Sequence, residues 1–303
     1  MNLSKCDICP RKCGVDREHG EVGYCGAGLD ISIALVSLHQ WEEPCLTGLH
    51  GAGTVFFSHC NMKCVFCQNW EVSHDGKGIA VSVERLSEIF MEQQKRGAAS
   101  LDLVTPTHYA PQIIEALKIA KRKGFTLPVV YNCGGYELDS TIEALHGFVD
   151  VFLPDLKYFD DTLAIRYSNS PNYFKYASAA IKKMYEITGP FVIENGRMIR
   201  GVIVRHLILP SHYKDSLKVL DFLYSEFGDG IYVSLMNQFT PFGMTKNYKE
   251  INRRLTTYEY DKVLDHAESL GMTNCFIQRG KTATSKFIPI FDCSNVEKAT
   301  DGI

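Results

Sequence analysis

The sequence predicts an α/β protein built as a partial (β/α)6 TIM-like barrel with a small Cys-rich, metal-binding N-terminal appendage. From residue 53 onward, apolar runs typical of buried strands alternate with amphipathic helical stretches. Such alternation indicates parallel strands joined by right-handed crossovers, with a doubly wound sheet as the alternative. Seven of the eleven cysteines fall in two groups within the first 67 residues. We therefore expect a Cys-rich segment with one strand at 1–50 and the barrel at 51–303.

The apolar runs give the expected strands, and the amphipathic stretches between them give the helices. Strands are expected at 31–38, 53–58, 101–105, 128–132, 149–153, 201–208 and 231–236, with a further one at 275–278. Helices are expected at 83–97, 111–124, 140–146, 172–185, 213–227 and 257–270. The helix at 111–124 has proline in its first turn and glycine at its end, the usual asymmetry.

Composition and charge narrow the class of protein. The 303 residues are 45% hydrophobic and 22% charged, as in an ordinary globular protein. A formal charge of -3 argues against a general binder of nucleic acid or of anionic membranes. The N-terminus lacks the apolar core of a signal peptide, and no apolar stretch approaches the length of a membrane span. We expect a cytoplasmic protein that does not enter a membrane.

Three cysteines follow the strand expected at 53–58. Cys60, Cys64 and Cys67 lie within eight residues, on a loop that can wrap one face of a four-iron cluster. Such clusters normally take four cysteines, so three would leave one iron open to another ligand. An open coordination position is also what distinguishes catalytic from structural zinc sites. The spacing therefore favours a catalytic iron–sulfur cluster, with a structural zinc half-site as the alternative.

A second group of four cysteines precedes this loop. Cys6, Cys9, Cys13 and Cys25 can close a complete site, either structural zinc or an auxiliary iron–sulfur cluster. We favour structural zinc, because nothing in the sequence demands a second electron carrier.

Polar residues follow every expected barrel strand. In a barrel or an open parallel sheet, function collects at the C-terminal ends of the strands. The expected ends carry, among others, Thr105, Asn132, Asp155, His206 and Gln238. We expect one site at the mouth of the barrel.

The cysteine loop and its surroundings resemble a known family. Three cysteines spaced by three and two residues, with an aromatic residue before the last, are the signature of radical S-adenosylmethionine (SAM) enzymes. Other segments resemble the PflX-like branch related to pyruvate formate-lyase activating enzyme. These segments are WEEPC at 41–45, GTVFFSHCNMKCVFCQN at 53–69, LVTPTHY at 103–109, VYNCGGYE at 130–137, LPDLK at 153–157, RHLILP at 205–210 and INRR at 251–254.

The resemblance implies a cofactor pair and a reaction. A [4Fe-4S] cluster on Cys60, Cys64 and Cys67 would bind SAM at its open iron and cleave it reductively. The resulting 5′-deoxyadenosyl radical would abstract hydrogen from a substrate. The electron would come from a donor such as flavodoxin or ferredoxin.

The resemblance also assigns SAM contacts. Phe66 would lie against the adenine, and Lys157 would meet the SAM carboxylate. Asp155 would hold Lys157 or a monovalent cation. Activating enzymes carry Gly-Gly-Glu after the second strand, where this chain has Thr105-Pro-Thr107, so either threonine could replace that contact. The remaining polar candidates are Asn132, Arg205 and Gln238, the last near the ribose.

Three functions are compatible with these features. The first is hydrogen abstraction from a protein or peptide, as in glycyl-radical activation. The second is radical SAM chemistry on a small molecule or another macromolecule. The third is a non-catalytic iron–sulfur or zinc protein, which would need a fourth cysteine to close the main cluster. Cys133 is the candidate for that ligand.

Overall fold

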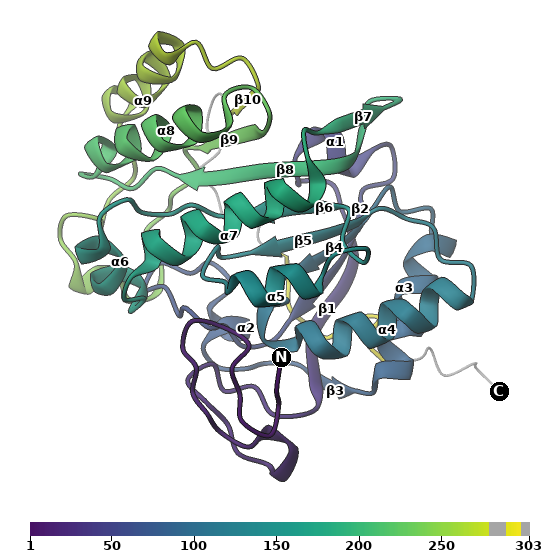
Figure 1. Ribbon diagram of the computed structural model, residues 1–303. Helices are drawn as coiled ribbons and strands as arrows, with labels where there is room; N and C mark the ends of the chain where they lie inside the picture. The colour runs from purple at the N-terminus through teal and green to yellow at the C-terminus, as the bar shows by residue number, and fades with distance from the viewer. Residues whose placement is uncertain (279–288, 298–303) are drawn as a thin grey trace.

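The computed structural model describes residues 1–278 and 289–297. Within these residues, ten strands form one open sheet (Figure 1). The strands are β1 (Ile31–His39), β2 (Ala52–Phe57), β3 (Ile79–Val81), β4 (Leu101–Val104), β5 (Val129–Cys133), β6 (Val151–Pro154), β7 (Val192–Glu194), β8 (Arg197–Leu207), β9 (Tyr232–Met236) and β10 (Cys275–Ile277). Their spatial order is β10-β9-β8-β6-β5-β4-β2-β1-β3, and β7 pairs with β8.

The centre of the sheet is parallel, as predicted. Every neighbouring pair from β2 to β10 along that order is parallel, whereas β1 is antiparallel to both β2 and β3. The edge strands β3 and β10 do not pair with each other, so the prediction of a partial barrel is confirmed. The sequence analysis missed β3 and β7, which have three residues each, too few for a recognisable pattern.

The six expected helices are present, with ends shifted by up to three residues. The helices are α1 (Pro44–Thr47), α2 (Trp70–Ser73), α3 (Val83–Lys95), α4 (Ala110–Arg122), α5 (Asp139–Ala144), α6 (Asp161–Ser168), α7 (Tyr173–Thr188), α8 (Tyr213–Phe227) and α9 (Thr257–Leu270). Local signals set several starts. The Ser82 hydroxyl accepts from the backbone N–H of Arg85 before α3, and Thr256 with Glu259 forms a capping box before α9. Helices α1, α2 and α6 were not expected.

Alternate residues of the central strands pack on opposite faces of the sheet. Tyr131 and Phe152 belong to the large core under the outer helices, whereas Val130 and Val151 belong to a second core on the inner face. That inner core also contains Leu46 of α1. The segment around α1 therefore fills one end of the barrel interior, which leaves the other end for a cavity.

Residues 1–30 form a lobe at the bottom of the view in Figure 1, coloured dark purple. Its ties to the barrel are direct: Arg17 Nη1 donates to the carbonyl of His108 at 2.7 Å, and the Thr141 hydroxyl donates to the carbonyl of Ile8 at 2.5 Å. Strand β1 pairs with β2, so the sheet crosses the predicted boundary at residue 50.

Among the described residues, none of the helices combines the length and apolar character needed to cross a membrane.

Candidate active site

A cavity of about 460 Å³ opens where the parallel strands end. It brings together most of the predicted site residues: Cys60, Cys64, Phe66, Cys67, Thr105, Asn132, Asp155, Lys157, Arg205 and Gln238. Cys133, the candidate fourth cysteine, lies on the same wall. Because these residues come from six different strands or the loops after them, the cavity is a product of the whole barrel.

The cysteine loop turns its three thiols into this cavity from one side. Two non-glycine residues in the loop, His59 and Lys63, have left-handed backbone conformations, with φ of 76° and 62°. Phe66 is buried and makes an edge-to-face contact with Phe239, with ring centroids 5.8 Å apart. These constraints hold the loop in a compact turn.

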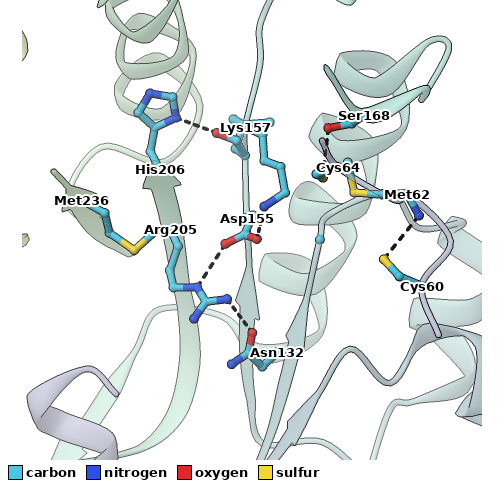
Figure 2. A network of polar contacts seen from close by, with 12 residues as sticks. Cys60, Met62, Cys64, Asn132, Asp155, Lys157, Ser168, Arg205, His206 and Met236 are labelled. Carbon is cyan, nitrogen blue, oxygen red and sulfur yellow. Dashed lines mark hydrogen bonds and ion pairs between the residues drawn. The ribbon is translucent and has the colours of Figure 1, made fainter. Parts of the chain in front are cut away.

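Each loop thiol accepts a hydrogen bond. In Figure 2 the Met62 N–H donates to Cys60 at 3.4 Å, and the Ser168 hydroxyl donates to Cys64 at 2.9 Å. The Ser73 hydroxyl donates to Cys67 at 3.2 Å. Hydrogen bonds to sulfur stabilise a negatively charged ligand set and tune the potential of an iron–sulfur cluster. Three thiols on one wall of a larger cavity fit a cluster that leaves one iron facing open space.

A chain of charged groups lies across the cavity from the cysteines, as Figure 2 shows. Asp155 is bridged on one oxygen by the Lys157 amine and on the other by Arg205 Nε at 3.0 Å. Arg205 Nη2 continues the chain to Asn132 Oδ1 at 2.6 Å. Burial would raise the pKa of Asp155, but Lys157 and Arg205 together lower it below its usual range. Asp155 is therefore a carboxylate that fixes two cations on the cavity wall.

Further acidic groups surround Arg205. Glu42 Oε2 lies 3.6 Å from Arg205 Nη1, and Asp102 Oδ2 accepts from Asn132 Nδ2 at 3.3 Å. Glu43 is buried on the cavity wall, and its Oε2 has no hydrogen-bond partner among the described residues. Burial raises the pKa of Glu42, raises that of Glu43 to about 7, and raises that of Asp102 well above its usual value. The sequence analysis assigned no role to these acids, although two of them form the pair just before Pro44.

Two of the remaining candidates differ in placement. Thr105, with φ of 59°, lies on the cavity wall. Thr107 does not: its hydroxyl donates to Glu137 Oε1 at 2.5 Å in the protein interior. Burial raises the pKa of Glu137 to about 8. Thr107 is thus separated from the site it was expected to serve, because the short helix at Thr107–Tyr109 turns it inward.

Gln238, by contrast, reaches the cavity after β9. Its Oε1 accepts a hydrogen bond from Nε2 of Gln278 at 3.1 Å. Gln278, the residue directly after β10, therefore holds the polar end of the Gln238 side chain in place.

The four N-terminal cysteines line a second, much smaller cavity. It measures about 10 Å³, and Cys6, Cys9, Cys13, Cys25 and His108 are among its lining residues. Backbone N–H groups donate to two of the thiols, Tyr24 N to Cys13 and Ala27 N to Cys25, both at 3.4 Å. These four cysteines, which the sequence groups into one site, thus line one cavity.

Comparison with known proteins places the chain in a family. The model of the radical SAM superfamily matches residues 54–220. An uncharacterized protein of Methanocaldococcus jannaschii is 30% identical over 282 residues, which cover 89% of this chain and 76% of that protein. The chain belongs to the radical SAM superfamily.

Solved structures share the fold. Streptococcus suis SuiB bound to its precursor peptide SuiA superposes with a TM-score of 0.51 at 14% identity, over 73% of this chain. The match spans 46% of SuiB. A radical SAM methyltransferase from Sphaerobacter thermophilus gives a TM-score of 0.52 at 15% identity, over 77% of this chain and 69% of that one. Family membership identifies this chain as a radical SAM enzyme, which uses a [4Fe-4S] cluster, SAM and an external electron donor.

Proposed function

We propose that this chain abstracts hydrogen from a protein or peptide substrate, as an enzyme of the PflX-like, activating-enzyme-related branch. The observation that carries the proposal is the single cavity in which three loop cysteines face a fixed chain of charged side chains. When bound there, the cluster and SAM supply a 5′-deoxyadenosyl radical. The protein's part is to hold both, orient them and exclude water.

Each wall of the cavity has a separate task in this proposal. Cys60, Cys64 and Cys67 hold the cluster. Lys157, fixed by Asp155, offers its ammonium group to the SAM carboxylate as a point charge. Phe66 offers a ring face for the adenine. The polar contacts to the rest of SAM come from Thr105, Asn132, Arg205 and Gln238.

A peptide substrate is supported by two features. The sheet is open, so the barrel does not close around its contents. SuiB, which shares this fold, has been solved with a precursor peptide bound.

All eleven cysteines are free, which fits a reducing cytoplasm.

The test separates catalysis from substrate choice. Anaerobically reconstituted protein is reduced with dithionite, mixed with SAM and assayed for 5′-deoxyadenosine. We expect product, and its absence from protein with a filled, reducible cluster would refute the radical chemistry. An extract of the source cells is then divided into a desalted macromolecular pool and a small-molecule filtrate. We expect the macromolecular pool to accelerate product formation, and a protease-treated pool to lose that effect.

A small cationic substrate is the second candidate, and Glu43 favours it. Four carboxyl groups (Glu42, Glu43, Asp102 and Asp155) face two cations, Lys157 and Arg205. The unpartnered Glu43 oxygen on the cavity wall would suit an amine or guanidinium group. Acceleration by the filtrate instead of the macromolecular pool, lost in Glu43→Gln, would decide for this candidate.

A further inference from the structure

The two cysteine sites are in contact through residues that directly adjoin their ligands. Gly26 directly follows Cys25, and His59 directly precedes Cys60. A Cβ added to Gly26 would lie 3.1 Å from Nδ1 of His59, so the ring packs against this glycine backbone. The residues adjoining one ligand of each site are therefore in van der Waals contact.

Further contacts join the same two segments. Arg11, between Cys9 and Cys13, donates from Nε to the carbonyl of Asn61 at 2.9 Å. The Tyr24 hydroxyl donates to the carbonyl of Met62 at 3.2 Å. Asn61 and Met62 both belong to the cysteine loop. In addition to its ties to the barrel, the N-terminal lobe thus contacts the cysteine loop directly.

The four N-terminal thiols line a cavity that is wider than a single bound metal ion requires. Zinc would draw four sulfurs to about 2.3 Å from one centre. A water-sized sphere, about 1.4 Å in radius, fits between the sulfurs only when each stands back by more than that bond length. The cavity of about 10 Å³ among Cys6, Cys9, Cys13 and Cys25 admits such a sphere. Within residues 1–278 and 289–297, no three Cys, His, Asp or Glu side chains converge closely enough to hold one metal ion.

The thiols of Cys60, Cys64 and Cys67 also do not converge closely enough to hold one metal ion. In the radical SAM family, such a loop binds a four-iron cluster. Ligands of a cluster bind different irons, so their sulfurs spread over a larger sphere than the ligands of one ion do. The N-terminal set shares this spread geometry with the loop and adds the fourth thiol that the loop lacks.

His108 also lies on the wall of the N-terminal cavity. It is 2% exposed, and its Nε2 donates to the carbonyl of Ser58 at 2.7 Å. In the neutral ring this leaves Nδ1 as a lone-pair acceptor, and Nδ1 has no partner among the described residues. The His108 ring is also 6.4 Å from the His59 ring, centroid to centroid.

We propose that Cys6, Cys9, Cys13 and Cys25 bind a second [4Fe-4S] cluster that is the electron entry to the first. A low-potential donor protein of the flavodoxin or ferredoxin class gives one electron to the N-terminal cluster. That electron then passes across the Gly26–His59 contact to the cluster on the loop, with no proton transfer. The relay rests on the proposed function in one respect, that Cys60, Cys64 and Cys67 hold a cluster.

Metal content and magnetic resonance of the wild-type protein test the site without any activity. Anaerobically reconstituted protein should contain about eight irons per chain, two clusters of four, and no zinc. After full reduction, electron paramagnetic resonance should show two cluster signals broadened by mutual spin coupling. The triple variant Cys60→Ala, Cys64→Ala, Cys67→Ala should keep about four irons and give one unbroadened signal. Zinc in the N-terminal site, or a single cluster in the wild-type protein, would overturn the proposal.

A glycine pair tests the route. Gly26→Ala places a methyl group against His59 at a φ of 86°, whereas a Cβ at Gly28 meets nothing within 4 Å and Gly28 has no positive φ. Both variants should keep about eight irons. We expect the ratio of flavodoxin-driven to dithionite-driven cleavage of SAM to fall more than roughly tenfold, about 1.4 kcal/mol of barrier, in Gly26→Ala only. An unchanged ratio in iron-replete Gly26→Ala refutes the route.

The double variant Cys9→Ala, Cys25→Ala should lower the same ratio still further. If it does not fold, the metal content and spin coupling of the wild-type protein still decide the site. Failure of the proposed function looks different: both clusters fill and couple, yet dithionite yields no 5′-deoxyadenosine.

Discussion

The two cysteine groups differ in what surrounds their sulfurs. The loop thiols open onto about 460 Å³ lined by charged and aromatic side chains, and two of them accept hydrogen bonds from serine hydroxyls. The N-terminal thiols enclose about 10 Å³ and accept bonds from backbone N–H groups. Among the described residues, room for a second molecule lies beside the loop thiols and not beside the N-terminal thiols. Both sites have cysteine ligands, but the space beside the loop thiols allows chemistry on a second molecule there. The N-terminal thiols are restricted to holding a group or passing electrons.

The largest expected effect comes from removing one ligand of each group in turn. Cys64→Ala should abolish the loop cluster and all 5′-deoxyadenosine formation, whichever reductant is used. Cys13→Ala should retain dithionite-driven product, because the loop cluster does not use this thiol. Cys275→Ala, in β10 and away from both cavities, is the matched control. Product formation by iron-replete Cys64→Ala would remove the functional distinction between the groups.

The next effect concerns Glu137, a buried acid between the two regions. Its carboxyl accepts from Thr107, and it contributes to the raised pKa values of both Cys9, on the N-terminal cavity, and Cys133, on the larger one. Burial raises the pKa of Glu137 from 4.5 to about 8. Between those values the unfolded chain loses its proton while the folded chain keeps it. The free energy of unfolding should therefore fall as pH rises from 4.5 to 8.

Glu137→Gln keeps the neutral shape and should remove the part of that fall that Glu137 causes. Relative to the wild-type protein, the variant should gain up to a few kcal/mol between pH 5 and pH 9, since one pKa unit corresponds to about 1.4 kcal/mol. Denaturant unfolding of the apo proteins at both pH values measures the difference. Equal pH dependence in the two proteins would show that Glu137 is ionised in the folded state.

The sequence was sufficient for the centre of the fold because its strands are buried on both faces and therefore read as continuous apolar runs. The sequence was also sufficient to predict that the polar residues after the strands meet in one site, because the C-terminal ends of parallel strands lie at the same edge of the sheet. It could not show that Thr107 turns inward while Thr105 faces the cavity, since both follow β4 within three residues. Nor could it place Glu43 opposite Arg205, because that proximity depends on α1 filling the inner end of the barrel.

For a related reason, the sequence alone does not decide between zinc and an iron–sulfur cluster at the four N-terminal cysteines. Spacing along the chain fixes which thiols can meet, but a single ion and a cluster differ in how far apart the sulfurs stand. That distance depends on tertiary packing, and in this lobe Arg11, Tyr24 and Gly26 pack against the cysteine loop.

A smaller effect is expected at the charged wall, which only the larger cavity has. Lys157→Ala removes a cation held by Asp155 and, in the proposed role, one charge-assisted contact to SAM. Such contacts contribute about 1.5–3 kcal/mol, so SAM should bind roughly tenfold to a hundredfold more weakly. Equilibrium binding to the reconstituted protein measures this. Lys118→Ala, which removes an exposed lysine paired with Glu115, should leave the affinity unchanged. An unaltered affinity in Lys157→Ala would mean that Arg205, and not Lys157, contacts the SAM carboxylate.

The smallest expected effect is a shift in the reduction potential of the loop cluster that leaves the potential of the N-terminal site unchanged. Ser168→Ala removes the hydroxyl that donates to Cys64 at 2.9 Å, the shortest of the hydrogen bonds to the cysteine sulfurs described above. That bond favours the more negative, reduced form of a cluster, so its loss should make the potential of the loop cluster more negative. The proposed N-terminal cluster should keep its potential, because among the bonds described its sulfurs accept only from the backbone N–H groups of Tyr24 and Ala27. Redox titration followed by electron paramagnetic resonance resolves the two signals, with Ser178→Ala on α7 as control. Equal shifts in both signals would mean that the clusters titrate as one unit, and that the hydroxyl contacts do not set the loop apart.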